Sequence, residues 1–278
     1  MAVLSVRDVS KSFDDEKIIN NISIELHEGE IVSLLGVSGG GKTSLFNIIS
    51  GLSRPDTGSV WLDGVDVTGK PGNVSYMLQK DLLLPYKSIV DNVALPLVIG
   101  GMKKKDAREK AASFFEEFGL AGTEKKYPAQ LSGGMKQRAA LLRTYLFSEK
   151  VALLDEPFSA LDMLTKQAVH EWYLDVMEKI HLSTLFITHD IDEAILLSDR
   201  IYLLTGRPGE ITKEIEIKEK NKDSQRYKDI LEVTEGRLVP EWLEADHDNL
   251  KGSVKQVPTR EIIDVPVNEM LIVELYSK

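Results

Sequence analysis

Residues 36–43, Gly-Val-Ser-Gly-Gly-Gly-Lys-Thr, restrict the possible folds of this chain more than any other segment. They fit the pattern G-x-x-x-x-G-K-[ST], in which backbone N–H groups surround the phosphates of a nucleotide. The largely apolar residues 30–35 predict a buried strand, and residues 44–49 predict an apolar helix whose positive dipole end points at the same place. Strand, loop and helix together indicate a phosphate-binding loop in an α/β fold rather than an ordinary glycine-rich turn.

The residue types in this loop suit contact with a nucleotide. Glycine lets the backbone wrap closely around phosphate with its N–H groups pointing inward. Lys42 adds a mobile positive charge for the outer phosphates, and the Thr43 hydroxyl is placed to bind Mg²⁺. The residues that we expect to hold the nucleotide here are Gly36, Ser38, Gly39, Gly40, Gly41, Lys42, Thr43 and Ser44.

Composition excludes several other classes of function. The chain has 34 lysines and arginines against 44 aspartates and glutamates, a net charge of −10, and no basic cluster that predicts a nucleic-acid partner. It has no cysteine, which excludes thiol catalysis, disulfides and cysteine-based zinc sites. Residues 1–15 lack the pattern of a signal peptide, and the longest apolar run, Val93–Met102, contains Pro96 and two glycines. We therefore expect that the chain does not cross a membrane by itself.

Polar side chains follow three further predicted strands. Gln79 follows the strand 74–78, Asp155 and Glu156 follow the apolar run 151–154, and His189 follows the strand 183–188. The carboxyl ends of parallel strands form the ligand-binding edge of an α/β sheet. Near a phosphate-bound Mg²⁺, Asp155 suits a metal ligand and Glu156 a general base for the attacking water. Taken alone, Gln79 could simply end its strand, and a single histidine is more often structural.

Two other positions suggest nucleotide contacts. Phe13 lies on a polar turn between the predicted strands 3–7 and 18–26, where an aromatic ring can stack on a purine. Taken alone, a phenylalanine at such a position more often packs in the core or on the turn. Ser132 is placed to cap a helix that begins with Gly133 and Gly134, and the two glycines leave the first N–H groups of that helix bare. A simple capped helix is the alternative interpretation.

In their order and spacing these segments resemble the nucleotide-binding subunit of an ABC transporter, over about residues 4–217. In the terms of that family, residues 36–43 are Walker A, 151–155 Walker B, 131–135 the signature and 159–162 the D-loop. The resemblance implies an α/β P-loop NTPase of ABC type, with a mixed sheet core, an inserted helical subdomain at about 81–147 and a small C-terminal extension. For catalysis the resemblance implies Glu156, His189 and Gln79. For ATP binding it adds Phe13, Ser132, Gly133 and Gly134 to the loop 36–43. At Mg²⁺ it implies Thr43, Gln79 and Asp155.

The resemblance also implies partners and a place of action. It implies an ATPase that dimerises head to tail on ATP, at the cytoplasmic face of the cell membrane, and drives solute transport through a partner permease. Residues 188–194 and the turn 206–211 look like importers of nitrate, sulfonates, taurine and thiamine precursors. An importer implies an external solute-binding protein as an indirect partner. The transported solute and the permease are not predicted, and the ATPase subunit of an exporter stays an alternative.

The C-terminal part differs in composition from the rest. Residues 211–278 hold 26 charged side chains in 68, against 52 in the preceding 210. We therefore assign residues 1–217 to the ATPase domain and 218–278 to a charged extension of unknown role. Within this extension, residues 225–244 predict one or two short helices, and residues 262–276 are prone to form strands.

Other classes of nucleotide-binding protein explain less of the sequence. A P-loop kinase or GTPase shares only the phosphate-binding loop, and the guanine-specific pattern Asn-Lys-x-Asp is absent. Soluble ABC proteins that act on ribosomes, DNA or chromosomes usually have two cassettes in one chain or a long coiled-coil insertion, and this chain has neither. A module that senses ATP without hydrolysing it tends to lose the catalytic acid, whereas Glu156 is present.

Overall fold

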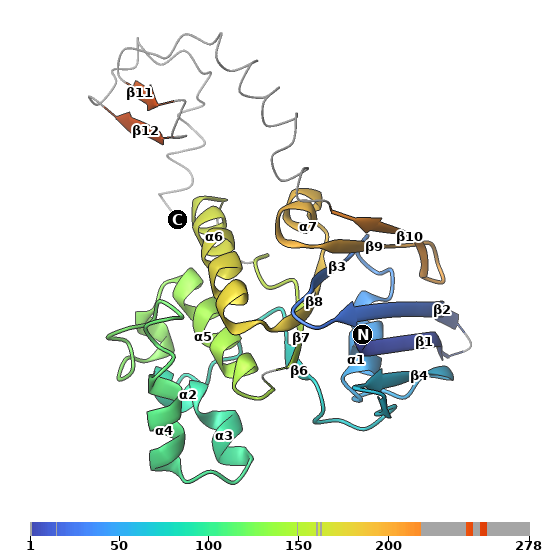
Figure 1. Ribbon diagram of the computed structural model, residues 1–278, viewed down its shortest axis with the longest axis horizontal. Coiled ribbons are helices and arrows are strands. Elements are labelled where there is room, and N and C mark those ends of the chain that lie inside the picture. Colours follow the sequence, from blue (N-terminus) through green and yellow to red (C-terminus); the bar gives the residue numbers. More distant parts are fainter. Residues whose placement is uncertain are drawn as a thin grey trace. The chain divides into compact units, whose positions relative to one another are not determined.

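The computed structural model describes residues 2–14, 16–148, 150–159, 161, 163–217, 243–246 and 251–254. It divides into two compact units, Met1–Lys218 and Glu219–Lys278, which are described here one at a time. The first unit contains two β-sheets and a group of helices (Figure 1).

One sheet of the first unit is antiparallel. Its four strands are β1 (Ala2–Phe13), β2 (Glu16–His27), β4 (Thr57–Leu62) and β5 (Val65–Asp66), in the order β2-β1-β4-β5. Along the second half of β2, buried apolar residues alternate with exposed ones, because only one face of the sheet packs on the core.

The other sheet is mixed and carries the strand ends identified in the sequence. Five strands run parallel: β3 (Ile31–Gly36), β6 (Ser75–Met77), β7 (Val151–Asp155), β8 (Ser183–Thr188) and β9 (Arg200–Thr205). The edge strand β10 (Glu210–Glu216) pairs with β9 in the antiparallel direction, which gives the order β10-β9-β3-β8-β7-β6. Every residue of β7 and β8 is buried, as expected for parallel strands covered on both faces. The predicted mixed sheet core is confirmed.

Two apolar cores hold the unit together. Helix α1 (Lys42–Ile49) buries Leu45, Phe46, Ile48 and Ile49 in a core that it shares with β1, β2 and β3. The second core lies among helices α2 (Ile89–Val93), α4 (Lys104–Ala112), α5 (Gly133–Tyr145) and α6 (Met163–Ile180), and includes Phe118 and Tyr173. Short elements complete the unit: α3 (Leu95–Ile99), the 3-10 helix η1 (Pro128–Gln130) and α7 (Ile191–Leu197).

The inserted helical segment is more broken than the sequence predicts. The expected helix 88–99 is split into α2 and α3, because Pro96 has no N–H to donate to the carbonyl of Asn92. The expected helix 103–118 ends at Ala112 and continues as turns. Residues 81–87 are not helical, since the buried Asn92 side chain accepts from Leu84 N and donates to the carbonyls of Leu84 and Lys87. One amide thus replaces the backbone hydrogen bonds that a helix would supply.

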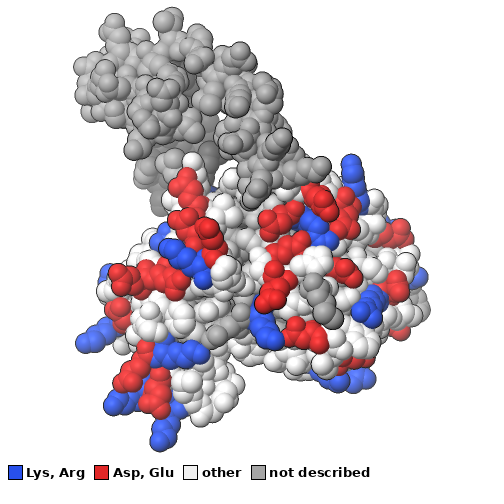
Figure 2. All heavy atoms as spheres, in the orientation of Figure 1, with Lys and Arg blue, Asp and Glu red and all other residues white. Residues whose placement is uncertain are grey.

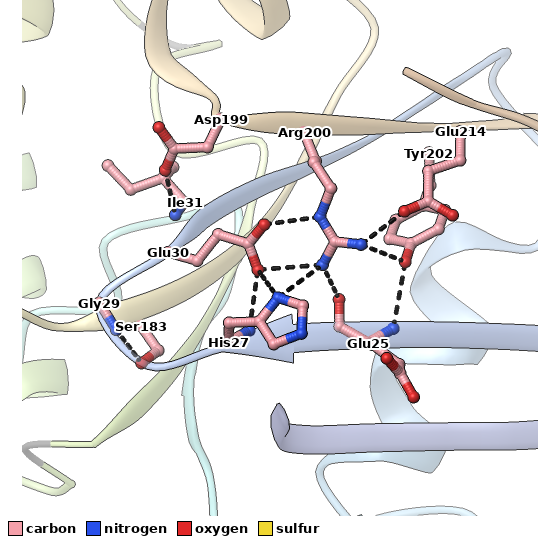
Figure 3. Close-up of polar contacts among 10 residues, drawn as sticks. All are labelled: Glu25, His27, Gly29, Glu30, Ile31, Ser183, Asp199, Arg200, Tyr202 and Glu214. Carbon is pink, nitrogen blue, oxygen red and sulfur yellow. Dashed lines mark hydrogen bonds and ion pairs between the residues drawn. The ribbon is translucent and has the colours of Figure 1, made fainter. Parts of the chain in front are cut away.

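At the amino-terminal end of the parallel strands, Arg200 joins the two sheets (Figure 3). Its guanidinium donates to Glu30 Oε1 at 2.6 Å, to Glu214 Oε1 at 2.5 Å and to the Glu25 carbonyl at 2.7 Å. Burial acts to raise the pKa of the Glu30 carboxyl, but the hydrogen bonds from Arg200 and from the His27 backbone outweigh it and hold that pKa below its ordinary value. Glu30 therefore stays ionised, and Arg200 fastens β2, β9 and β10 at this end.

Charges of both signs are interspersed on the face of the first unit that Figure 2 shows. Among the residues that the structure describes, no helix is long and apolar enough to cross a membrane.

The described part of the second unit is a pair of antiparallel strands, β11 (Leu243–Asp246) and β12 (Lys251–Val254). The helical prediction for residues 225–244 is wrong at Leu243 and Glu244, which belong to β11. The rest of that prediction, and the strand prediction for residues 262–276, lie outside the described residues. The assignment of residues 218–278 to a separate extension stays a prediction.

Candidate active site

The glycine-rich loop connects β3 to α1 and leaves the start of that helix open. Gly41 has φ +90°, and a Cβ there would lie 2.5 Å from Ile19 Cγ2, so no other residue fits without displacing β2. No side chain caps the N-terminus of α1. The first N–H groups of the helix are therefore available to an anion.

Lys42 places its positive charge inside the loop. Its Nζ donates to the Gly36 carbonyl at 2.7 Å and to the Val37 carbonyl at 2.9 Å. Burial lowers the pKa of Lys42, while the negative charges of Glu156 and Asp155 act in the opposite direction. The Lys42 ammonium group thus contacts two carbonyls of the loop and is attracted by the carboxylates of Glu156 and Asp155.

Asp155 and Thr43 form an oxygen pair suited to a hard cation. Asp155 Oδ2 lies 3.4 Å from Thr43 Oγ1 and 3.4 Å from the Tyr76 hydroxyl. A hydroxyl and a carboxylate are hard oxygen ligands of the kind that Mg²⁺ prefers, so these two side chains would hold the ion. Burial, followed by the charge of Glu156, raises the pKa of Asp155, which a nearby cation would lower again.

Glu156 is held between the two polar residues that follow the neighbouring strands. Its Oε2 accepts from Gln79 Nε2 at 3.0 Å, and its Oε1 lies 3.2 Å from His189 Nδ1. The Glu156 backbone has φ +45°, in the left-handed region that non-glycine residues seldom occupy, and its N–H donates to the Ile187 carbonyl at 3.0 Å. The fold thus directs this carboxylate toward both partners at the carboxyl edge of the sheet.

A cleft of about 410 Å³ brings most of the predicted residues together. It is lined by Ile18, Ser38, Gly39, Gly41, Lys42, Thr43, Ser44, Gln79, Asp155 and Glu156. Gly36 and Gly40 belong to the loop behind this lining, and His189 contacts Glu156. Gln79 directs its amide nitrogen to Glu156, and its expected role at the metal stays a prediction. Ile18 was missed, because in the sequence it shows only the apolar pattern of a strand.

Other predicted residues lie away from this cleft. Phe13 ends β1 with 49% of its surface exposed, and Lys11 Nζ lies 5.3 Å from its ring centre. Ser132 caps α5, since its hydroxyl accepts from Met135 N at 3.3 Å, and Gly133 and Gly134 form the first turn. Neither group lines the cleft of its own chain, so their nucleotide contacts stay predictions. Ala160 and Asp162 of the expected D-loop lie outside the described residues.

The cleft combines a phosphate-binding loop, the oxygen pair of Thr43 and Asp155, and the Glu156 carboxylate. Together these groups define a P-loop nucleotide hydrolase. The chain belongs to the ABC transporter family, whose pattern matches residues 19–159, and it is an ATPase of that family. It is 47% identical over 207 residues to the formylaminopyrimidine import ATP-binding protein ThiZ of Halalkalibacterium halodurans, covering 74% of this chain and 81% of that protein. It is 37% identical over 218 residues to the nitrate import ATP-binding protein NrtD of Synechocystis sp., covering 77% and 82%.

Solved structures agree with this family. The dimeric structure of MJ0796, a bacterial ABC transporter cassette, matches with a TM-score of 0.65 and 28% identity, covering 77% of this chain and 99% of that one. The structure of cbiO1 from Clostridium perfringens matches with a TM-score of 0.72 and 21% identity, covering 85% and 96%, and shows the fold alone. The predicted fold class and ATPase class are therefore confirmed.

The turn 206–209 supports the phosphate-binding loop, a contact that the sequence does not reveal. Gly209 N donates to the Ile18 carbonyl at 2.8 Å, and the Gly209 carbonyl accepts from Asn20 N at 3.0 Å. A Cβ on Gly209 would lie only 2.3 Å from the Gly40 carbonyl oxygen. Backbone thus packs directly on backbone here, and the position of the loop depends on the absence of a side chain at residue 209.

We expect Gly209→Ala to weaken ATP binding. The added methyl group must push the loop away, and overpacking of this kind costs about 1–3 kcal/mol, which corresponds to about a 5–150-fold loss of affinity. Equilibrium binding of a fluorescent ATP analogue measures the change. Gly100→Ala is a matched control, because neither glycine has a left-handed φ and a Cβ on Gly100 has its nearest neighbours at 3.4 Å. Unchanged affinity in Gly209→Ala would show that the turn does not set the position of the loop.

Proposed function

We propose that this chain is the ATP-hydrolysing subunit of an importer for a small organic or inorganic solute, of the nitrate, sulfonate, taurine or thiamine-precursor type. The observation that carries the catalytic part is the Glu156 carboxylate, held between Gln79 and His189 over the phosphate-binding cleft. Importer relatives support the direction of transport, among them the aliphatic sulfonates import ATP-binding protein SsuB of Bacillus cereus, 37% identical over 234 residues, covering 82% of this chain and 92% of that protein.

Each side chain has a definite task in hydrolysis. The N–H groups at the start of α1 bind the phosphates, and Lys42 pairs with the outer ones. Thr43 and Asp155 would hold Mg²⁺, which neutralises phosphate charge when it is bound. Glu156 accepts the proton of the attacking water, while Gln79 and His189 keep its carboxylate oriented. Phe13 offers its exposed ring to the adenine.

The Ser132 turn acts on the ATP of a second copy. It is a capped helix start with bare N–H groups, and it does not line the cleft of its own chain. A head-to-tail dimer with two-fold symmetry brings each Ser132 turn over the partner's cleft, so both ATP sites are completed at once. The MJ0796 cassette, whose solved structure is dimeric, supports the pairing of two copies.

A groove beside the helical segment receives the permease. It has a volume of about 310 Å³ and includes the apolar side chains of Leu52, Val74, Leu95, Ile99 and Phe147. Ile99 is 76% exposed, and the neighbouring loop also exposes Leu82, Leu84 and Tyr86. An apolar surface of this kind suits a protein partner. A chain bound there lies at the cytoplasmic face of the membrane, and an external solute-binding protein acts on the other side. The role of the extension 218–278 stays unknown.

Purification of the tagged chain from detergent-solubilised membranes tests this function. We expect a permease to copurify, and Ile99→Glu to reduce its recovery at least tenfold, because a buried unpaired carboxylate opposes apolar docking. Val65→Glu is the control, since Val65 is also an exposed apolar residue, at 62%, and lies outside the groove. Recovery of ribosomal or chromosomal partners in place of a permease would identify a soluble ABC protein instead.

A further inference from the structure

Lys166, His170 and Glu193 form a polar cluster in which α6 contacts α7; His170 and Glu193 are buried, and Lys166 is partly exposed. We propose that these three side chains are positioning residues for hydrolysis, which hold His189 against Glu156. The proposal rests on the role given to His189 under the proposed function. It assigns a task to three charged or titratable side chains that do not line the nucleotide cleft.

Glu193 is the centre of the cluster. Its Oε1 lies 2.8 Å from Lys166 Nζ and 3.2 Å from His170 Nε2, and its Oε2 accepts a hydrogen bond from the Thr188 hydroxyl. Only 4% of its surface is exposed. Burial acts to raise the pKa of Glu193, but the hydrogen bonds from His170, Lys166 and Thr188 outweigh it and hold that pKa below its ordinary value. The carboxylate is thus ionised, and both of its oxygens are engaged.

The cluster holds both chain neighbours of His189. Thr188 is tied to Glu193, and its hydroxyl also accepts from Asp190 N at 3.1 Å. Asp190 Oδ2 accepts from Lys166 Nζ at 2.7 Å. Because the residues before and after His189 are held by Glu193 and Lys166, the cluster fixes the backbone position from which the His189 ring reaches Glu156.

The same cluster reaches the segment that carries Glu156. The Phe158 ring packs edge-on against the His170 ring, with 4.8 Å between the ring centres. Phe158 is buried two residues after Glu156 and also packs against Tyr173 on α6. One helix therefore supports both members of the Glu156–His189 pair, whose Oε1–Nδ1 distance is 3.2 Å. Catalytic groups keep their geometry when the side chains behind them are locked in this way.

Glu193→Gln tests the proposal, because it keeps the size of the side chain and removes its charge. We expect kcat for ATP to fall about 10–100-fold, the scale of a small misplacement of a catalytic group, while ATP affinity changes less than about twofold. Lys166→Met should act in the same way, and Lys166→Arg, which keeps the charge, should retain most of kcat. Asp192→Asn is the control, since Asp192 is an exposed acid on the same helix and lies outside the cluster.

A double-mutant cycle with His189→Ala decides whether the cluster acts through His189. If it does, Glu193→Gln causes no further loss of kcat once His189 has been removed. An equal loss in both backgrounds overturns the proposal, and so does a loss of thermal stability with kcat unchanged. If His189→Ala alone leaves kcat unchanged, the proposal also fails, while the role of Glu156 is tested separately by its own variant.

Discussion

Glu156→Gln is expected to lower ATP turnover by about 10²–10⁴-fold, the usual contribution of a general base. An amide cannot accept the proton of the attacking water, yet it has nearly the same shape as the carboxylate. Nucleotide binding should survive, because Glu156 is not among the groups expected to bind the phosphates directly. Steady-state phosphate release measures turnover, and equilibrium binding measures affinity.

The matched control for this variant is Glu109→Gln, which makes the same chemical change on an exposed part of α4. It should hydrolyse ATP at the wild-type rate. Gln79 and His189 both contact the Glu156 carboxylate, so the fold of each variant should be compared by thermal unfolding. Wild-type turnover in Glu156→Gln would exclude this residue as the base and leave the cleft without an assigned proton acceptor.

Lys42→Ala and Ser132→Arg are each expected to abolish ATPase activity, and a mixture of the two proteins is expected to regain part of it. Loss of Lys42 removes a charge from the phosphate site, and hydrogen bonds to charged groups contribute about 1.5–3 kcal/mol. An arginine at residue 132 blocks the start of α5. In a head-to-tail dimer both changes fall on one composite site and leave the other intact.

The size of the recovery follows from the symmetry of the dimer. An equal mixture places about half of the chains in heterodimers, each with one intact site, so about a quarter of wild-type activity should return. If heterodimers form and no activity returns, the dimerisation of Ser132→Arg alone decides the cause. Normal ATP-driven dimerisation by that variant would show that Ser132 makes no contact across the interface.

The parts of the site that could be predicted are those whose residues lie close together in the sequence or directly follow a strand. The loop 36–43 shows its function because several residues of one motif must be adjacent to surround a phosphate. Gln79, Glu156 and His189 could be grouped because each follows a parallel strand, and such strands end at a common edge.

Contacts between distant segments could not be predicted in this way. Gly209 supports Gly40 because an edge strand turns back over the loop, which no local pattern encodes. The interruption around Asn92 depends on one buried amide that satisfies backbone groups of another segment. Lys166 and Glu193 are far apart in sequence, and on their own helices they look like ordinary surface charges.

The Arg200 contacts have a mechanical consequence. They lie where the parallel strands begin, whereas the nucleotide cleft lies where they end, about 20 Å away along the six residues of β3. Arg200 ties β2 of the antiparallel sheet to β9 and β10 of the mixed sheet, so the two sheets resist sliding past each other. We therefore expect a change of shape at the cleft during hydrolysis to displace the two sheets as one body.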